Sequence, residues 1–410
     1  MEMKPGYKQT EVGLIPEDWD VTTVGNEFSI QLGKMLDSEK NVGVPKSYLG
    51  NRAVQWGRID LNDLGVIRMT PSDLQRFRLL KGDLLVCEGG EIGRAAIWNE
   101  PIAECYYQKA LHRLRPIRGY KVQLMLNVLQ RLASTGYLTN FVTQTSIAHL
   151  PKDKFEKVPI PRPSSLSEQE AIAEALSDAD ALIESLEQLI AKKRQIKQGA
   201  MQELLTGKKR LPEFSGEWEV KTLMDVCSSI TDGTHFTPQY METGIPFYSV
   251  ENVTANNFAD TKFISVKEHN QLVKRCKPEK GDILLTRIGA IGDTKLIDWD
   301  VEASIYVSLA LLKVKHGIDS RYIHCYTKCR QFRLDIEERS LMNASPKKIN
   351  MGEIGGVPIP LPELAEQTAI AAILSDMDAE IAALEAKLAK VRQLKQGMMQ
   401  ELLTGRVRLI

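Results

Sequence analysis

The chain has 410 residues, of which 43% are hydrophobic and 26% charged, and its net charge at pH 7 is zero. This length predicts two or three domains, and the composition excludes intrinsic disorder and collagen-like structure. No uncharged apolar run approaches the ~18 residues of a membrane span, and the first residues lack the apolar stretch of a signal peptide. We therefore expect a cytoplasmic protein whose six scattered cysteines form no disulfide framework.

The first part of the chain, residues 1–162, has the pattern of a mixed α/β domain preceded by an N-terminal segment. Short runs of β-formers alternate with Gly, Pro, Asn and Asp, and one such run, 83–86, predicts a strand. Residues 122–132 have helical spacing of apolar residues. The glycines at 89–93 lack the full spacing of a phosphate-binding loop and predict a hairpin turn.

The next segment, 163–211, predicts one long helix. Apolar or small residues alternate at steps of four and three, which is the pattern of a heptad seam, and they occupy positions 172, 176, 179, 183, 186 and 190. Gly207 follows the last apolar turn as a helix stop. If residues 166–206 are all helical, the rod is about 60 Å long.

The second half repeats this order, with a mixed α/β domain at 212–361 and a long helix in the segment 362–410. We expect strands at 283–285 and within 303–314, a hairpin turn at 288–292 and a helix over 321–338. The second long helix has seam residues at 370, 374, 377, 381, 384, 388 and 391. Gly405 is its predicted stop.

The two halves are copies of one unit. Residues 168–211 align without gaps to 366–409, with 29 identities in 44 positions, and weaker matches such as Trp19 and Trp218 lie 199 residues apart. The predicted fold class is therefore α+β: two mixed α/β domains in tandem, each followed by a long α-helix. Because both seams are apolar, we expect the two helices to pack together, and a plain core bundle is the alternative. We predict that they pair as an antiparallel coiled coil with pseudo-two-fold symmetry.

Gly199 and Gly397 occupy equivalent places inside the predicted helices, at a cost of about 1 kcal/mol each relative to alanine. Close approach of another backbone or a bend in the helix would explain them, and a tolerated defect is the simpler alternative.

Motifs of unaided catalysis are absent from the sequence. It contains no G-x-x-x-x-G-K-[ST], G-x-S-x-G, H-E-x-x-H or paired Cys-x-x-Cys, and it lacks the Pro-Pro signature of an amino-methyltransferase. We expect no catalytic residues, no metal and no cofactor.

Several motifs together resemble the specificity subunit of type I restriction-modification systems. They are Val-Pro-Ile-Pro at 158–161 and 357–360, the Glu-Gln helix openings at 168–169 and 366–367, the Arg-Gln-x-Lys-Gln-Gly…Leu-Leu-Thr-Gly endings at 194–207 and 392–405, and Asp-Gly-Thr-His-Phe-Thr-Pro at 232–238. The resemblance covers essentially the whole chain. It implies a non-catalytic protein that binds double-stranded DNA, with each globular domain reading one half of a split target. It also implies two docked methyltransferase subunits, with restriction and translocation subunits in the full complex, and no membrane.

Base recognition needs hydrogen-bonding side chains presented from loops, and arginines suit phosphates. The DNA-contact candidates in the first domain are Gly33, Lys34, Gln55, Arg58, Arg113, Arg115, Arg118, Gln144, Thr145 and Ser146. Those in the second domain are Asp232, Gly233, Thr234, His235, Glu251, Asn252, Arg287, Asn343, Ser345 and Lys347. Candidates for partner binding on the repeated helices are Arg194, Gln195, Lys197, Gln198, Gln202, Arg392, Gln393, Lys395, Gln396 and Gln400.

The two domains differ at the best-defined motif. Lys34-Met35-Leu36-Asp37 in the first domain lacks the Asp-Gly-Thr-His form of the second, so we expect the domains to read unlike sequences and the target to be asymmetric. The zero net charge leaves an alternative open: a coiled-coil structural adaptor whose domains bind ligands other than DNA.

Overall fold

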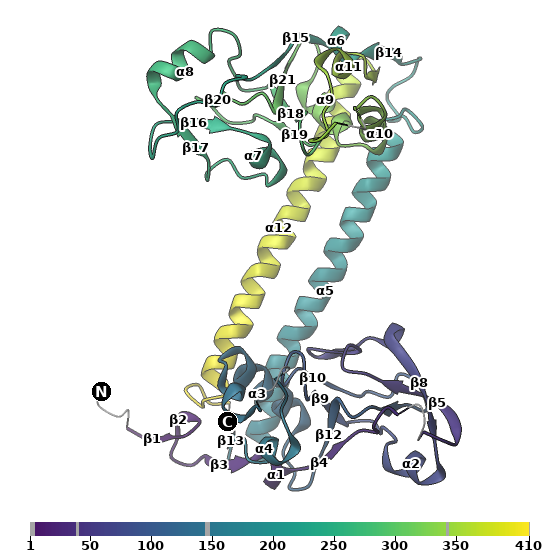
Figure 1. The fold of residues 1–410 in the computed structure, drawn as a ribbon, viewed down its shortest axis with the longest axis vertical. Helices are drawn as coiled ribbons and strands as arrows, with labels where there is room; N and C mark the ends of the chain where they lie inside the picture. Colours follow the sequence, from purple (N-terminus) through teal and green to yellow (C-terminus); the bar gives the residue numbers. More distant parts are fainter. Residues whose placement is uncertain (1–4, 38–40, 144–147, 342–343, 410) are drawn as a thin grey trace. The chain divides into compact units, whose positions relative to one another are not determined.

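The computed structural model describes residues 5–37, 41–143, 148–341 and 344–409, and the elements are labelled in Figure 1. The chain divides into two compact units. Unit 1 comprises residues 1–187 and 386–410, and unit 2 comprises residues 188–385. Each unit therefore contains one mixed α/β domain, called here a head, together with parts of both long helices. Among the described residues, no helix combines the length and apolar character needed to cross a membrane.

Both heads are built on the same four-stranded antiparallel sheet. In unit 1 its order is β10-β9-β12-β4, formed by Ala95–Ile97, Leu84–Cys87, Leu111–Pro116 and Phe28–Leu32. In unit 2 its order is β19-β18-β21-β15, formed by Thr294–Leu296, Ile283–Thr286, Leu309–Val314 and Cys227–Asp232. The glycine-containing segments at 89–93 and 288–292 join antiparallel neighbours, which confirms both predicted hairpins.

A second, three-stranded sheet recurs in the same way. Its strands in unit 1 are β11 (Tyr106–Tyr107), β5 (Val44–Leu49) and β8 (Leu64–Met69). In unit 2 they are β20 (Ser304–Ile305), β16 (Ile245–Tyr248) and β17 (Lys262–Ile264). Each unit also has a two-stranded ribbon made by the Val-Pro-Ile-Pro motif, β13 (Pro159–Arg162) with β3 (Asp20–Thr23) and β22 (Pro358–Leu361) with β14 (Glu219–Thr222). A ribbon of two strands suits prolines, which cannot donate to a ladder.

Unit 1 has two further small hairpins, β1–β2 and β6–β7, formed by Tyr7–Thr10 with Gly13–Pro16 and by Val54–Gln55 with Arg58–Ile59. Its shorter helices are α1 (Val24–Glu27), α2 (Pro71–Arg76), α3 (Val122–Ser134) and α4 (Lys152–Phe155), with 3-10 turns at Leu61–Asp63 and Tyr137–Phe141. Those of unit 2 are α6 (Leu223–Val226), α7 (Val250–Thr254), α8 (Val266–Leu272), α9 (Ser320–Thr327), α10 (Arg330–Glu338) and α11 (Met351–Gly355).

The helix expected over 321–338 is broken into α9 and α10. Cys329 lies between them with an extended backbone, and its sulfur accepts a hydrogen bond from the N–H of Phe332. A new helix therefore starts there, because the side chain caps the first turn of α10. The apolar spacing persists across the break, since both helices bury one face in the same core.

The two long helices are α5 (Leu166–Leu204) and α12 (Leu364–Leu402). The seam residues predicted for both are buried or half-buried, which confirms the heptad pattern. Gly207 and Gly405 follow the helix ends with φ values of 70° and 65°, as expected of helix stops.

Ion pairs between α5 and α12 fix an antiparallel register. In unit 1, Asp180 pairs with Lys395 at 2.6 Å and Glu187 pairs with Arg392 at 2.5 Å, so partner numbers fall as residue numbers rise. In unit 2, the equivalent pairs are Lys197–Asp378 and Arg194–Glu385, both at 2.5 Å. Because each pair in one unit is the exchanged copy of a pair in the other, the helix pairing has the predicted pseudo-two-fold symmetry.

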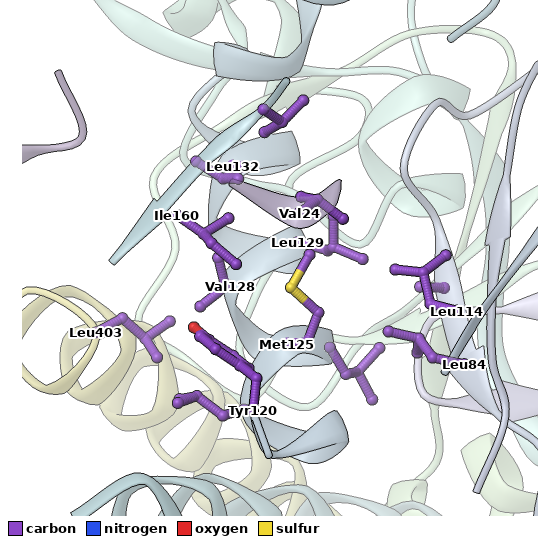
Figure 2. Close-up of a cluster of buried hydrophobic side chains, with 14 of the residues drawn as sticks. Val24, Leu84, Leu114, Tyr120, Met125, Val128, Leu129, Leu132, Ile160 and Leu403 are labelled. Carbon is purple, nitrogen blue, oxygen red and sulfur yellow. The ribbon is translucent and has the colours of Figure 1, made fainter. Parts of the chain in front are cut away.

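The core of each head also contains both helices. Figure 2 shows the core of unit 1, where Leu403, just beyond α12, lies beside Tyr120 and near Val128 of α3. Ile172 and Leu176 of α5 belong to the same cluster. In unit 2, Leu204 of α5 joins Ile370 of α12 in the equivalent cluster. Burial of these apolar side chains ties the helices firmly to each head.

The repeated glycines inside the helices are not explained by contacts within the chain. A Cβ atom built on Gly199 or Gly397 meets no described atom within 4 Å. Of the explanations left open, close approach by another backbone of this chain therefore does not apply to the described residues, because the space beside the glycines is open.

Candidate functional site

The motif glycines Gly33 and Gly233 occupy equivalent positions, directly after β4 and β15. A Cβ atom would lie 2.3 Å from the carbonyl oxygen of Gln108 at the first position and 2.0 Å from that of Ile305 at the second. Only glycine fits such an approach. The structure thus brings the two motif loops to matching places, as their alignment in sequence predicts.

In the second head, Asp232 is the centre of a charged cluster at the base of this loop. Its carboxylate is bonded to Arg275 Nη2 at 3.0 Å, Arg287 Nη1 at 3.2 Å and His235 Nε2 at 2.9 Å. Asp232 is 9% exposed and Arg287 8% exposed. Their hydrogen-bonding groups therefore face one another inside the protein, and they position the loop that carries Thr234 and His235.

The other candidates of the second head vary in exposure. Asn252 is buried and holds its own turn, since its side chain donates to the carbonyls of Asn257 and Asp260. Lys347 is half-buried and pairs with Glu337 at 3.0 Å. His235, Glu251 and Ser345 are exposed, whereas Thr234 is buried.

The three arginines of the first head do not form one exposed basic patch. Arg113 is 7% exposed and donates to Gln31 Oε1 at 2.5 Å, and Arg115 pairs with the buried Asp83 at 2.5 Å. Only Arg118 is well exposed. The arginines at 113 and 115 are thus committed to contacts inside the head, because they lie on β12 with partners from distant parts of the chain.

The remaining candidates of the first head are more open. Lys34 is half-buried and pairs with Asp73 at 2.9 Å, and Gln55 is half-buried and donates to the carbonyl of Arg52. Arg58 is exposed on β7. Gln144, Thr145, Ser146 and Asn343 lie outside the described residues.

Most of the helix residues singled out for partner binding line a groove in each unit. The groove of unit 1 has a volume of about 810 Å³ and includes Arg392, Lys395, Gln396 and Gln400. The groove of unit 2 has a volume of about 880 Å³ and includes Arg194, Lys197 and Gln198. Gln195, Gln202 and Gln393 are exposed but do not line either groove.

The Glu-Gln openings of the long helices attach each helix to its head. Glu168 accepts a hydrogen bond from Trp19 Nε1 at 3.0 Å and pairs with Arg408 from the end of the chain at 2.9 Å. Gln169 accepts from the backbone N–H of Lys121 at 3.2 Å, which satisfies the residue that precedes α3.

Unit 2 repeats this clamp residue for residue. Glu366 accepts from Trp218 Nε1 at 3.0 Å and from Arg210 Nη2 at 2.7 Å. Gln367 accepts from the N–H of Asp319 at 2.9 Å. The motif therefore has a structural role, and it joins the start of one long helix to the residues that follow the other.

Two groups of residues were not identified from the sequence, one in the motif loops and one in the grooves. Phe236 is 81% exposed beside His235, and Met35 and Leu36 are exposed in the equivalent loop of the first head. The equivalence of the two loops was the available signal for them. Arg131 and Lys328 line the two grooves from the heads, where the repeat is too weak to single them out. Among the described residues, no group of three His, Cys, Asp or Glu side chains could hold a metal ion.

Comparison with known proteins gives one consistent family. A model of the type I restriction modification DNA specificity domain matches residues 16–196 and again residues 215–393. A putative type I restriction enzyme MjaX specificity subunit of Methanocaldococcus jannaschii is 26% identical over 98% of this chain and 96% of its own length. The EcoBI specificity subunit of Escherichia coli is 23% identical over 67% of this chain and 64% of its own length.

A solved structure agrees at the level of the fold. The S subunit of a type I restriction-modification system from M. genitalium superimposes with a TM-score of 0.62 and 18% identity, covering 98% of this chain and 99% of that one. The duplicated domain match spans most of the chain, and the fold has the same tandem plan. The chain therefore belongs to the family of type I restriction-modification specificity subunits, the non-catalytic components of those systems, and it carries their DNA specificity domain twice.

Proposed function

We propose that this chain reads a split, asymmetric DNA target, with one half-site for each head, and that it docks two methyltransferase subunits through its helices. Restriction and translocation subunits complete the full complex, which acts in the cytoplasm. The observation that carries the proposal is where the two copies of the repeat are similar in sequence. The helices match across the repeat, and the loops of the heads differ. Matching copies suit two identical partners, and differing loops suit two different half-sites.

The two heads carry chemically different side chains at one equivalent position, which supports unlike half-sites. Glu88 follows β9 in the first head and Arg287 follows β18 in the second, and the backbone N–H of each donates across the sheet at 2.9 Å, to Ala110 and Ser308 respectively. Burial raises the pKa of Glu88. A carboxylate accepts hydrogen bonds where a guanidinium donates them, so the two motif loops are supported by opposite chemistry, with the buried Arg287 bonded to Asp232 in the second head.

The side chains best placed to meet DNA are those that are exposed near the motif loops. We assign His235 and Phe236 to this role in the second head, with Asp232 and Arg287 positioning the loop behind them. In the first head, Arg58 and Arg118 are exposed but lie away from the motif loop, and Arg118 stands beside Glu27 at the start of β4. An exposed aromatic ring offers stacking or wedge contact with bases, and an exposed arginine offers a phosphate contact.

The test is selection of bound duplexes from a randomised library, followed by footprinting, with the chain in complex with its methyltransferase subunit. We expect two protected blocks of different sequence separated by an unread spacer, and binding that weakens as salt rises. A single protected block, or two identical blocks, would contradict the proposal. Methylation or cleavage by the chain alone would also contradict it.

The open space beside Gly199 and Gly397 supports docking on the helices. Both glycines lie on the surface of their helices within the repeated Arg-Gln-x-Lys-Gln-Gly motif, next to groove residues Gln198 and Gln396. A helix surface without a side chain allows the backbone of a partner to approach closely. Two equivalent openings support two copies of one partner.

A further inference from the structure

The grooves of the two units share a floor and differ in their walls. Lys395, Met399 and Asp180 line the floor in unit 1, and Lys197, Met201 and Asp378 are their equivalents in unit 2. The walls come from the heads, which have diverged. A partner segment that fits one floor therefore fits the other and meets a different wall.

The groove of unit 1 has more positive than negative charge. Its lining has four basic side chains, Arg131, Arg392, Lys395 and Arg406. It has two acidic ones, Asp180 and Glu187. Both acidic groups are already paired across the helices, Asp180 with Lys395 and Glu187 with Arg392. Of the other two cations, Arg406 makes a single ion pair within the described part of the chain, an exposed contact of 3.5 Å with Glu401.

Arg131 is a cation of this groove without an ion pair among the described residues. It lies half-buried on α3, and among the described residues no carboxylate comes within ion-pair distance of it. Burial, together with the charge of the nearby Arg406, lowers the pKa of Arg131. A half-buried cation without a counter-charge costs free energy, so this groove lacks a negative group that would relieve it.

The groove of unit 2 also has more positive than negative charge, and the exposed Lys328 is one of its cations. In unit 1, Gln130 on α3 accepts a hydrogen bond from Lys395 at 3.0 Å. The position 198 residues later is Lys328, at the end of α9, so a second ammonium stands near Lys197 where unit 1 has an amide. Partial burial lowers the pKa of Lys328; the nearby carboxylate of Asp378 opposes this shift, and the charges of Lys197 and Lys295 add to it. No described acidic side chain forms an ion pair with Lys328.

We infer that each groove receives an acidic segment of the docking subunit, with carboxylates placed against Arg131 and Arg406 in unit 1 and against Lys328 and Lys295 in unit 2. This inference rests on the proposed docking of two copies of one partner. A protein segment fits better than a free anion or DNA, because the groove also presents apolar side chains such as Met399 and Ile183, which an anion alone would leave uncovered.

The inference is tested by titrating the chain with the purified methyltransferase subunit of the same system, with native mass spectrometry for stoichiometry and calorimetry for affinity. The variants are Arg131→Gln, Lys328→Gln and the double variant. Arg52→Gln and Lys280→Gln are matched controls, since these side chains are 86% and 60% exposed and lie outside the grooves. We expect each groove variant to weaken one of the two sites by about tenfold or more, because a carboxylate loses its counter-charge.

The double variant should weaken both sites and show a shallower dependence on NaCl than the wild type. Arg131→Lys keeps the charge and should restore most of the affinity of the first site. Lys328→Gln should leave the thermal midpoint of the free chain unchanged or raise it, because removing the charge removes the cost of desolvating it.

The outcomes separate this inference from the function on which it rests. If the wild-type chain binds no methyltransferase subunit, the proposed docking fails and the inference fails with it. If the wild type binds two copies and the groove variants bind them equally well, docking stands and the acidic-segment inference is wrong. Loss of DNA affinity in Arg131→Gln without loss of partner affinity would make the occupant a nucleic acid and would also overturn it.

Discussion

A carboxylate that is 9% exposed and bonded to two guanidinium groups, as Asp232 is, has more effect through its charge than through its shape. Asp232→Asn keeps the shape and leaves Arg287, whose side chain is 9% exposed, without its counter-charge. We expect the free energy of unfolding of unit 2 to fall by about 3 kcal/mol, the usual cost of breaking one side of a buried ion pair. Urea unfolding with hydrogen exchange resolved to unit 2 measures this change. Glu251→Gln, at an exposed site in the same head, is the control and should change stability by less than about 0.5 kcal/mol.

His112 introduces a dependence of stability on pH in unit 1. It is fully buried, and burial lowers its pKa to about 4, whereas an unfolded histidine titrates near 6.5. Below pH 6.5 the unfolded chain binds a proton that the folded chain excludes, so the contribution of His112 to stability falls as the pH drops toward 4. Between pH 7 and pH 5, we expect the wild type to lose about 2 kcal/mol more than His112→Gln.

Urea unfolding of unit 1 at the two pH values measures the difference. His316→Gln is the matched control, because His316 is exposed, and it should leave the pH dependence unchanged. Equal losses in wild type and His112→Gln would contradict the argument.

Single residues show where sequence reasoning stops. The equivalence of Gly33 and Gly233 follows from motif position alone, and the close backbone contact at both confirms it. The interior location of Arg113 and Arg287 could not be predicted, because the groups that hold them, Gln31 and Asp232, lie 82 and 55 residues away in sequence. A cluster of basic residues in the sequence shows the charge of a segment, but it does not show which distant residue neutralises that charge.

At the scale of elements, the long helices were the most predictable part of the fold. Their seams repeat over many turns and their stops are glycines, so the pattern gave the helices almost to the residue. The segment 321–338 was less predictable, because the cap by Cys329 interrupts the backbone without interrupting the apolar spacing. Local capping can thus divide an element whose periodicity looks continuous.

Substituting the repeated helix glycines tests whether they serve the fold or the docking of a partner. The space beside Gly199 and Gly397 is open, so Gly199→Ala and Gly397→Ala should raise the helix stability of the free chain by up to about 1 kcal/mol each. The same changes should weaken binding of the methyltransferase subunit, because a methyl group enters the space that its backbone would occupy. Thermal melting and calorimetric titration give the two results.

A matched control for these changes is Ser185→Ala, at an exposed position of α5 outside both grooves. Destabilisation of the free chain by the glycine changes would show that the glycines serve the fold, and unchanged partner binding would show that docking does not use them.

At the scale of the whole molecule, the internal repeat predicts more than the presence of two similar heads. The residues after α12 take the place in unit 1 that the linker after α5 takes in unit 2, as the clamps Arg408–Glu168 and Arg210–Glu366 demonstrate. The ring of Trp19 lies against Arg408 and that of Trp218 against Arg210 in the same way. The repeat alone did not reveal that the end of the chain completes the first unit, because this follows from the antiparallel pairing of the helices.

We propose that the paired helices also hold the two half-sites of the target at a fixed separation, and this leads to a prediction for the complete complex. Inserting one heptad after Glu187 and one after Glu385 keeps both seams in phase and lengthens each helix by about 10.5 Å. If the helices set the distance between the half-sites, the unread gap should grow by about three base pairs at 3.4 Å each, with the half-sites themselves unchanged. Selection from a randomised library measures the gap. A heptad inserted in α5 alone is the control, and it should lower DNA affinity because pairs such as Asp180–Lys395 and Lys197–Asp378 can then no longer form in one register. An unchanged gap in the doubly lengthened chain, with both half-sites still recognised, would show that something other than helix length sets the spacing.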